Sequence, residues 1–534
     1  MKRVFPRSWP PLAGVLAATV GLTSGELVAS LFNAAGPVVV VGDGVVDRVP
    51  PGMKRWAIST FGTNDKIALI AGVVAITLVY AAFVGRATAR RFVNGVVGVV
   101  AFAGVGVAAA LSGRAPSAKD ALGVTAAFAA TLAGLWVLIG RIQKVGEPTE
   151  LTPEGDDRED TPGAAVRRPS APTVVGRRQF LVMGGGATAA AAASFGVSRV
   201  LQEDVVAATA KPIPESVRRL PMQKLATENG IANMPPFFSP NDNFYRIDTA
   251  LVVPRVDAST WSLKVVGKVD RELTISYDDL RTGKLGPLIE HDCTLMCVSN
   301  EVGGDLVGNA RWTGVRLRDI LNKAGVQEGA TQVFSTSVDG FTAGFPTEVA
   351  LDGREAMVAI GMNGQPLPAR HGFPARLVVP GIYGYVSAVK WISNIKLTTF
   401  EEDAGYWIPR GWSAIAPVKT SSRIDVVGSN GRIARSLTAG PVPIGGVAWA
   451  QHVGITKVEV QIDEGPWKVA KLANDGGIDT WRQWSLVWDA TSGRHRIRVR
   501  ATDATGFTQT EERVDVAPNG AEGWHTVEVT VSDV

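Results

Sequence analysis

The hydrophobic pattern of the N-terminal part consists of long apolar runs separated by short polar connections. Glu26 is the one charged residue inside these runs, which cover residues 12–32, 67–85, 92–111 and 121–140. A helix needs about 20 apolar residues to cross the hydrocarbon core of a bilayer. The pattern therefore predicts a four-helix transmembrane domain over residues 1–145.

A polar segment and a fifth apolar run follow these helices. Residues 146–176 are rich in proline, aspartate and glutamate, which predicts a disordered linker. Arg177 and Arg178 then precede an apolar run, and together they resemble a twin-arginine export signal. We expect residues 177–201 to form a fifth, uncleaved transmembrane helix. The alternative is an ordinary last helix with arginines at its cytoplasmic end.

Lysines and arginines are concentrated on one side of the predicted helices. They precede the first apolar run, separate the second from the third, and follow the fourth. The positive-inside rule places these segments in the cytoplasm. With five spans, everything after residue 199 lies outside. We therefore expect a multi-pass protein of the cell membrane whose catalytic part is extracytoplasmic.

The pattern of the soluble part changes near residue 410. Short β-like and helical runs alternate irregularly over residues 235–410, without a GxGxxG or P-loop motif, which favours an α+β domain over a nucleotide-binding one. Residues 411–534 contain short alternating strands separated by Gly, Asp and Asn turns. This second pattern predicts an all-β, immunoglobulin-like sandwich.

Composition narrows the classes of function. The 534 residues carry a formal net charge of +4 with 19% charged residues, and basic residues form no stripe with aromatics, so we expect no nucleic-acid partner. The mean hydropathy of +0.13 is typical of a chain with membrane segments. Two cysteines are too few for a disulfide-stapled secreted scaffold.

Both cysteines lie in one stretch, residues 290–312, where a β-like run passes into a loop rich in Gly and Asn. A strand that ends in a loop can present a thiolate to a soft metal. Two cysteines are too few for a zinc or iron–sulfur site, and a free cysteine is often a small buried hydrophobe. The stretch alone leaves both interpretations open.

Several separated motifs carry a family resemblance. They are FYR at 244–246, ARWTGV at 310–315, MNGQPL at 362–367, HGFPAR at 371–376, VPG at 379–381 and VKW at 389–391. Together with the cysteine stretch, these motifs resemble the sulfite oxidase family of molybdopterin-dependent oxidoreductases in order and spacing. The resemblance implies a molybdenum–molybdopterin cofactor.

The resemblance also implies the roles of individual residues. Cys297 is the metal ligand, and Cys293 is assigned to packing in preference to a disulfide between the two. A cofactor with a phosphate and ring hydrogen-bonding groups needs cations and polar donors. The implied cofactor-binding residues are Phe244, Tyr245, Arg246, Cys297, Asn300, Asp339, His371, Arg376, Ser387 and Lys390, and the implied catalytic residues are Cys297, Arg246, Arg311 and Phe341.

The chain departs from the family where sulfite oxidases bind their anionic substrate. Val302 stands in place of an arginine, Phe341 in place of a tyrosine, and 247–249 (IDT) in place of Arg-Asn-His. Glu301 and Asp248 add negative charge, which disfavours a dianion in a low-dielectric site. We therefore expect two-electron oxygen-atom transfer on a small neutral molecule, such as reduction of a sulfoxide or N-oxide. The alternatives are sulfite oxidation and a non-catalytic binding ectodomain.

All five histidines follow the last predicted span, and the chain has no CxxCH motif. The membrane helices therefore supply no histidine pair for a haem, and we expect no haem. Electrons are expected to pass through a separate partner. The immunoglobulin-like domain implies a homodimer by its resemblance to the family.

Overall fold

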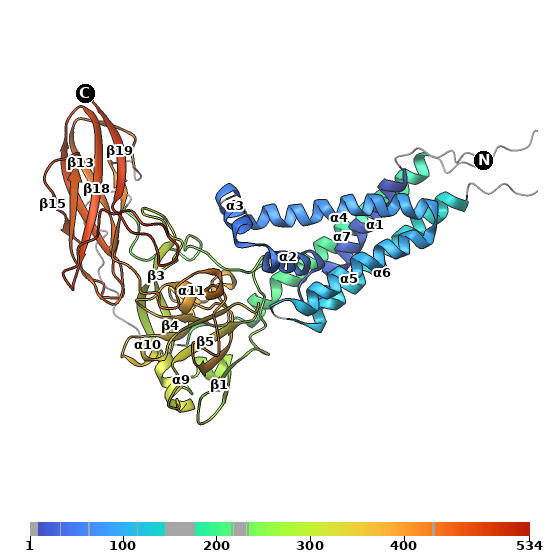
Figure 1. Cartoon of the computed structure of the whole chain (residues 1–534), viewed down its shortest axis with the longest axis horizontal. Helices are drawn as coiled ribbons and strands as arrows, with labels where there is room; N and C mark the ends of the chain where they lie inside the picture. Colours follow the sequence, from blue (N-terminus) through green and yellow to red (C-terminus); the bar gives the residue numbers. More distant parts are fainter. Residues whose placement is uncertain are drawn as a thin grey trace, which may run out of the picture. The chain divides into compact units, whose positions relative to one another are not determined.

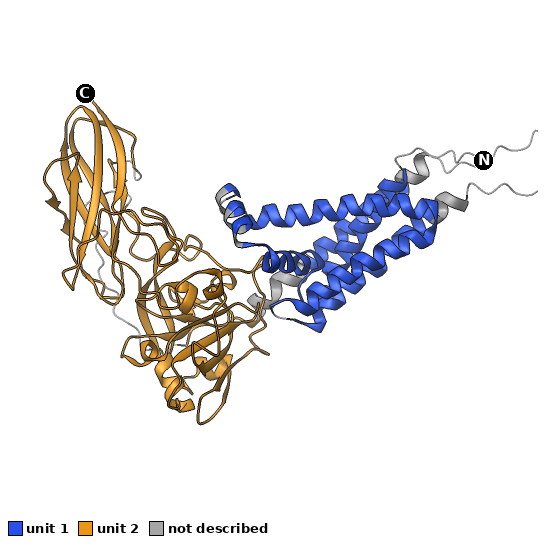
Figure 2. Cartoon of the chain, in the orientation of Figure 1, with its two compact units in different colours: residues 1–204 blue, residues 205–534 orange. Residues whose placement is uncertain are grey.

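The computed structural model describes residues 9–32, 34–61, 65–114, 116–144, 177–214, 217, 231, 234–429 and 433–533. The chain forms two compact units, Met1–Asp204 (unit 1) and Val205–Val534 (unit 2) (Figure 1, Figure 2). The linker predicted at 146–176 lies outside the described residues. The domain boundaries predicted from the sequence are not tested by this division and stay predictions.

The N-terminal part is helical. Its helices are α1 (Trp9–Leu31), α2 (Pro37–Arg48), α3 (Pro51–Phe61), α4 (Asp65–Arg90), α5 (Phe92–Ser112), α6 (Ala118–Lys144) and α7 (Arg177–Thr209). The four predicted apolar runs correspond to α1, α4, α5 and α6, so the helical, apolar character of this part is confirmed. The hydrophobic pattern did not predict α2 and α3, because both are shorter than a membrane span.

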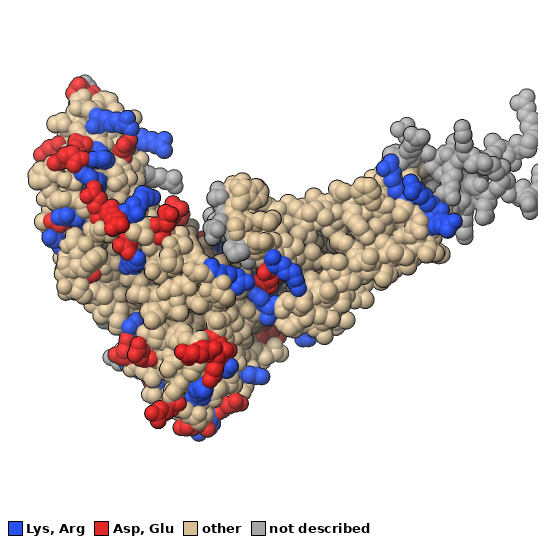
Figure 3. Space-filling model, viewed as in Figure 1, with Lys and Arg blue, Asp and Glu red and all other residues tan. Residues whose placement is uncertain are grey.

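Four helices of the described residues are long and apolar enough to cross a membrane. They are Trp9–Leu31, Asp65–Arg90, Phe92–Ser112 and the segment Ala118–Ile139 of α6. On the face drawn in Figure 3, the charged side chains of unit 1 gather toward its ends and leave a wide uncharged surface between them. Helix α7 starts at the paired arginines, while the fifth span and the export signal stay predictions.

Glycines let α1 approach α4 and α6 closely. A Cβ atom on Gly14 would lie 2.0 Å from the carbonyl oxygen of Ala81, and one on Gly21 would lie 2.0 Å from Oγ1 of Thr131. Apolar helices in a bilayer commonly pack through such small residues, because close backbone approach increases their van der Waals contact. These glycines therefore determine how tightly the helices of unit 1 pack.

The first half of unit 2 combines strands with short helices, as the irregular pattern predicts. Its elements are β1 (Ser262–Gly267), β2 (Leu273–Ser276), α8 (Tyr277–Arg281), β3 (Leu288–Met296), β4 (Val307–Arg316), α9 (Leu317–Ala324), β5 (Gln332–Ser337), β6 (Thr342–Pro346), α10 (Thr347–Leu351), β7 (Met357–Met362), β8 (Gln365–Pro366), η3 (Ala369–His371), β9 (Arg376–Val378), α11 (Gly384–Ser387), β10 (Ile392–Thr398) and η4 (Ile408–Arg410). One sheet has the order β3-β4-β7-β8 with β9 on β7. The other has the order β2-β1-β10-β5-β6, in which β1 and β10 run parallel.

The second half of unit 2 is rich in β-strands, as predicted. They are β11 (Ser421–Val427), β12 (Ser436–Thr438), β13 (Gly440–Trp449), β14 (Ile455–Ile462), β15 (Lys468–Val469), β16 (Lys471–Leu472), β17 (Arg482–Ala490), β18 (Gly493–Asp503) and β19 (His525–Ser532). The two sheets, β11-β13-β17-β16 and β12-β19-β18-β14-β15, share a core that includes Val458, Trp484 and Ile497. The immunoglobulin type of this fold stays a prediction.

Strand β3 carries Cys293 and is buried at all positions but one. It pairs with β4 along its whole length. From the second half of unit 2, Trp481 donates its backbone N–H to Oγ1 of Thr294 (2.8 Å), and Nε1 of Trp449 lies 3.1 Å from Sδ of Met296. Both halves of unit 2 therefore hold this strand in place.

Truncation of Ile497 tests the core of the second half. This side chain is 0% exposed, so Ile497→Ala should lower the free energy of unfolding by about 2–5 kcal/mol, because the cavity it leaves collapses only in part. The matched control is Val487→Ala at a side chain that is 65% exposed, and it should change this free energy by less than about 0.5 kcal/mol. Urea unfolding followed by tryptophan fluorescence measures both, and equal effects would contradict the assigned core.

Candidate functional site

Cys297 follows β3 at the start of a tight loop. Its backbone N–H donates to the carbonyl oxygen of Leu306 (2.9 Å), and its carbonyl oxygen accepts from the N–H of Asn300 (3.0 Å). The side-chain oxygen of Asn300 accepts from the N–H of Leu306 (2.8 Å). These bonds close the loop and fix the thiol, which is free and 7% exposed. Burial raises the pKa of the Cys297 thiol above its usual value.

The Cys297 side chain lines an open cavity of about 750 Å³ in unit 2. The cavity brings together seven residues that the sequence had assigned to the site, namely Phe244, Tyr245, Cys297, Asp339, Phe341, Arg376 and Lys390. The other lining residues are Ile247, Asp248, Thr249, Ser337, Gly384, Tyr385, Ala388, Trp391 and Trp407. Among these, residues 247–249 could be noticed in the sequence, because all three differ from the family pattern.

Two buried cations face this cavity. The guanidinium of Arg376 donates to the carbonyl oxygens of Leu377 (3.3 Å) and His371 (3.1 Å), and no carboxylate pairs with it within the described part of the chain. It also lies over the ring of Trp312, 4.9 Å from the ring centre. Burial lowers the pKa of Arg376 to about 10 and that of Lys390 to about 8. Both groups are therefore cations held in surroundings that disfavour their charge.

Asp248 neutralises part of this charge. One carboxylate oxygen lies 2.8 Å from Nζ of Lys390, and the same carboxylate receives two bonds from the guanidinium of Arg246, at 2.8 and 3.2 Å. The Asp248 side chain is only 6% exposed, so solvent screens these pairs little. Arg246 itself does not line the cavity. The Asp248 carboxylate therefore lies between Lys390, which lines the cavity, and Arg246, which does not.

Arg311 lies in β4 and does not line the cavity. It forms a bidentate pair with Asp292 of the neighbouring strand β3, with bonds of 2.7 and 2.9 Å, and Glu290 lies 3.8 Å away. The hydrogen bond to Asp292 raises the pKa of Arg311 further. The structure therefore places this residue in a buried ion pair, whereas the sequence suggested a cation that faces the substrate.

Three other predicted residues also lie outside the cavity lining and hold its surroundings. Nε2 of His371 lies 2.7 Å from the carbonyl oxygen of Asn241, and burial lowers the pKa of His371 to about 4. The ring is therefore neutral near pH 7 and donates from Nε2. Oγ of Ser387 donates to the carbonyl oxygen of Tyr383 (3.0 Å) within α11. Asn300 closes the loop after Cys297.

An aromatic wall forms one side of the cavity. The Phe341 ring centre lies 5.9 Å from that of Tyr406, which contacts Trp407 at 5.1 Å. Trp407 contacts Trp412 at 6.2 Å, and Trp412 contacts Tyr385 at 5.8 Å. No spacing in the sequence indicated this wall, because its members come from three segments, namely the turn before β6, helix α11 and residues 406–412.

The structure agrees with the assignment of Cys293 to packing. This side chain is 0% exposed, and both cysteines are free thiols. In contrast, the structure contradicts the expectation that Glu301 adds negative charge to the site. Glu301 is exposed and does not line the cavity, and Val302 does not line it either. The negative charge near the cavity therefore comes from Asp248 and Asp339 rather than from Glu301.

Comparisons with known proteins indicate which kind of enzyme this site resembles. The chain matches the model of the oxidoreductase molybdopterin binding domain over residues 250–407. It is 28% identical to mitochondrial sulfite oxidase of Homo sapiens over 459 residues, which cover 75% of this chain and 82% of that protein. These matches support the sulfite oxidase family of molybdopterin-dependent oxidoreductases as the family of this chain. It is thus an enzyme, and this family assignment overturns the alternative of a non-catalytic binding ectodomain.

Other proteins resemble this oxidoreductase over shorter stretches. It is 29% identical to NADH nitrate reductase 1 of Oryza sativa subsp. japonica over 321 residues, which cover 49% of this chain and 35% of that protein. Among solved structures, the sulfane dehydrogenase SoxCD from Paracoccus pantotrophus has a TM-score of 0.48 and 22% identity, covering 55% of this chain and 82% of that chain.

The residues of this family member fit a molybdopterin cofactor. Cys297 offers a soft sulfur ligand, and Arg376 offers a buried guanidinium for a phosphate. Nδ2 of Asn300 and Oδ2 of Asp339 are buried without a hydrogen-bond partner among the described atoms. Buried polar atoms are normally satisfied, so these two atoms point to a bound group with hydrogen-bonding edges.

Two histidines with lowered pKa values predict that acid destabilises the cofactor-free protein. Burial lowers the pKa of His371 and of His525 to about 4, whereas an unfolded histidine titrates near 6.5. Between these values the unfolded chain binds more protons, so stability falls as the pH drops from about 6.5 to 4, by on the order of 3 kcal/mol for each histidine. We expect His371→Gln to remove about half of this dependence.

The control for this experiment is His495→Gln. The pKa of His495 is raised, against the effect of partial burial, by its hydrogen bond to Asp463, so this residue contributes stability at low pH that is lost as the pH rises. The control should leave the acid-dependent loss in place. Urea unfolding at pH 7.0, 5.5 and 4.5 measures the three proteins. The assignment fails if His371→Gln retains the full dependence.

Proposed function

We propose that this protein is a membrane-anchored reductase that removes an oxygen atom from a small neutral donor, such as a sulfoxide or an N-oxide, outside the cytoplasm. The observation that carries the proposal is the place of Asp248. Its carboxylate pairs with Lys390 at the wall of the cavity that holds Cys297. The carboxylate here cancels the positive charge of Lys390 that an anionic substrate would otherwise use, and it leaves a neutral substrate unaffected.

The cofactor of the family would be held by residues that this cavity already brings together. Cys297 would ligate the molybdenum, while Arg376 and Lys390 would bind the phosphate and the polar edges of the pterin. His371 would support them from behind as a neutral donor. When bound, the cofactor supplies the exchange of one oxygen atom and two electrons. The protein supplies orientation and electrostatics.

The reaction consumes two electrons and two protons. A dialkyl sulfoxide then gives the dialkyl sulfide and one water molecule, and an N-oxide gives the amine and one water molecule. Neither substrate carries a net charge. The aromatic wall, which includes Phe341, Tyr385 and Trp407, offers apolar surface for the organic groups of such a substrate. Phe341 lacks the hydroxyl that a tyrosine would place there.

Sulfite oxidation is the second candidate. The similarity to the human enzyme named sulfite oxidase favours it, as do the two cations at the cavity. The paired Asp248 carboxylate is the observation against it, because sulfite would have to displace or tolerate a buried negative charge. The two candidates differ in the direction of electron flow, so they can be separated by assay.

The helical N-terminal part supports membrane anchorage. Four helices have the length and composition of spans, and the positive-inside rule together with a fifth span would place unit 2 outside the cytoplasm. Electrons would come from a separate donor, since we expect no haem in the chain. A homodimer through the β-rich second half of unit 2 belongs to the same proposal.

Replacement of the two cysteines separates ligation from packing. The cofactor's own sulfur atoms also hold the metal, so Cys297→Ala should keep molybdenum in the purified protein. It should nevertheless lose the sulfur-to-metal absorption band and lower the rate of sulfoxide reduction by about 100-fold or more. Cys293→Ala is the matched control and should keep both. Metal analysis, visible absorption and turnover with a reduced viologen dye measure these outcomes. Absence of molybdenum from the unchanged protein would overturn the proposed function.

Replacement of Asp248 tests the choice of substrate. Asp248→Asn should raise kcat/KM for sulfite oxidation by about 10- to 100-fold, because one negative charge near the cavity is removed. Glu301→Gln makes the same change of charge at an exposed position outside the cavity, and it should leave this value unchanged. Steady-state kinetics with sulfite and with dimethyl sulfoxide measure both. Equal effects of the two variants would contradict the role of Asp248.

A further inference from the structure

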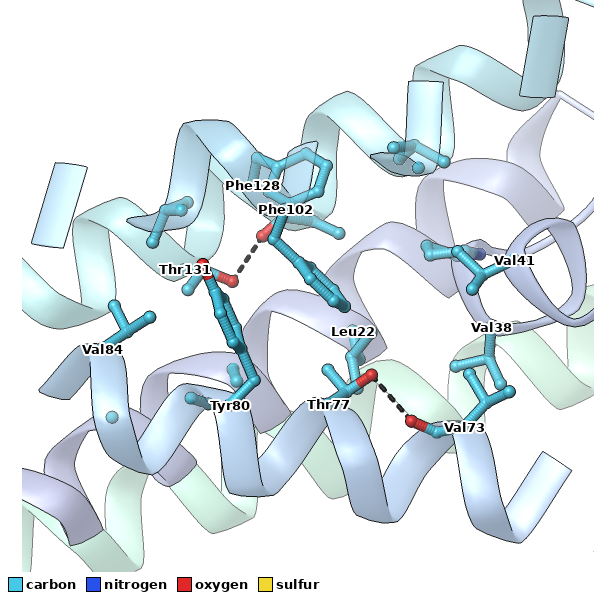
Figure 4. A pocket seen from close by; sticks show the side chains of 18 of the residues that line it. Leu22, Val38, Val41, Val73, Thr77, Tyr80, Val84, Phe102, Phe128 and Thr131 are labelled. Carbon is cyan, nitrogen blue, oxygen red and sulfur yellow. Dashed lines mark hydrogen bonds between the residues drawn. The ribbon is translucent and has the colours of Figure 1, made fainter. Parts of the chain in front are cut away.

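A second cavity lies among the helices of unit 1. It is an open cavity with about 720 Å³ of empty space, part of which is open to solvent, and α1, α2, α4, α5 and α6 all contribute to its walls (Figure 4). Every residue that lines it is uncharged. The candidate active site belongs to unit 2, so this cavity needs an explanation of its own.

Small and large side chains give this cavity its shape. Gly14, Ala18 and Ala127 line it, and their size leaves space that larger residues would fill. The rings of Tyr80 and Phe102 stack beside each other, with their centres 5.1 Å apart and their planes at 23° (Figure 4). A third ring at position 128 meets Phe102 edge-on at 6.4 Å. The cavity therefore offers a flat aromatic surface next to open space.

The polar groups at this cavity are hydrogen-bond acceptors. Tyr80 donates its hydroxyl proton to the carbonyl oxygen of Gly98 (2.9 Å). Thr77 and Thr131 donate theirs to carbonyl oxygens one helical turn earlier, at 2.8 and 2.7 Å (Figure 4). Each hydroxyl oxygen thus keeps lone pairs for a ligand. Apolar cavities with so few polar partners do not favour water, so an organic occupant suits this one better.

We propose that this cavity binds the aromatic head of a lipid-soluble quinol. A quinol ring is flat and stacks on aromatic side chains, and its two hydroxyl groups donate protons to acceptors such as the oxygens of Tyr80 and Thr131. Its isoprenoid tail is apolar, as is the cavity lining. A saturated acyl chain has neither a planar face nor a donor, so it would use neither the ring pair nor the hydroxyl oxygens.

This proposal rests on the proposed reductase function. The bound quinol would supply the electrons that the reductase consumes. A quinol that is oxidised to the quinone releases two electrons and two protons. The reduction of one sulfoxide to a sulfide and water consumes the same number of each. The quinol thus balances the reaction proposed for unit 2, and it is the separate electron donor that the chain requires.

Binding is tested first, with the full-length protein in lipid nanodiscs and decylubiquinol as the probe. Tyr80→Phe removes one acceptor and should weaken binding by about 3- to 10-fold. Phe102→Ala removes the stacking partner and should weaken it by more than about 10-fold. Phe83→Leu alters a ring on the same helix that is 64% exposed, so this control should bind like the unchanged protein. The binding is measured by competition with an azido-quinone photolabel.

The turnover of a sulfoxide then separates this proposal from the proposed function. With a reduced viologen dye as donor, all three variants should match the unchanged protein, whereas Tyr80→Phe and Phe102→Ala should be slower with decylubiquinol. The proposal is overturned if the photolabel binds all variants equally, or if a saturated phospholipid analogue displaces it as well as decylubiquinol does. If viologen drives no turnover in any protein, the reductase function fails, while the binding result still decides the cavity.

Discussion

The burial of strand β3 is the constraint on which the candidate active site depends. The strand pairs with β4 on one edge and receives contacts from the second half of unit 2 through Trp449 and Trp481. A strand held in this way cannot shift along its neighbour without exposing its apolar residues, because a one-residue slip turns every side chain to the other face. Cys297 comes directly after this strand, and its position in the cavity follows.

The electrostatic character of the cavity follows from a shared carboxylate. Two cations, Arg246 and Lys390, compete for Asp248, whereas Arg376 donates to backbone carbonyl oxygens and pairs with no carboxylate among the described residues. The cavity therefore contains one cation, Lys390, whose charge is balanced by a carboxylate. The charge of the other cation, Arg376, would be balanced by a bound anion. In the proposed reductase, a cofactor phosphate would bind Arg376 and an uncharged substrate would occupy the space near Lys390. Two ligands of different charge can then use one cavity without competing.

Much of this architecture could be predicted from the sequence. Hydrophobic runs gave the long helices, the change of period gave the β-rich second half, and the family resemblance gave seven of the residues that line the cavity. The pairing of Arg311 with Asp292 was missed, because the two residues are 19 positions apart and meet only through the β3–β4 register. A motif shows which residue types are present, whereas their partners depend on strand register and packing.

The same limit applies to the aromatic wall and to the cavity of unit 1. Tyr385 of α11 meets Trp407 and Trp412 on either side of η4 through a chain path that the sequence does not specify. The cavity among the helices depends on side-chain sizes that face each other across five elements, and no single periodicity contains that information. Glu301 illustrates the converse case. Its position in the motif suggested a role in the site, but the chain turns it toward solvent.

The lowered pKa of Lys390, near 8 because of burial, would link cofactor insertion to proton uptake in the proposed enzyme. An electronegative edge of a bound pterin near this amine would favour its charged form and raise its pKa, so a fraction of the molecules would take up a proton as the cofactor enters. Insertion then becomes weaker as the surroundings become more alkaline. The buffer in which the enzyme matures therefore influences how completely it is assembled.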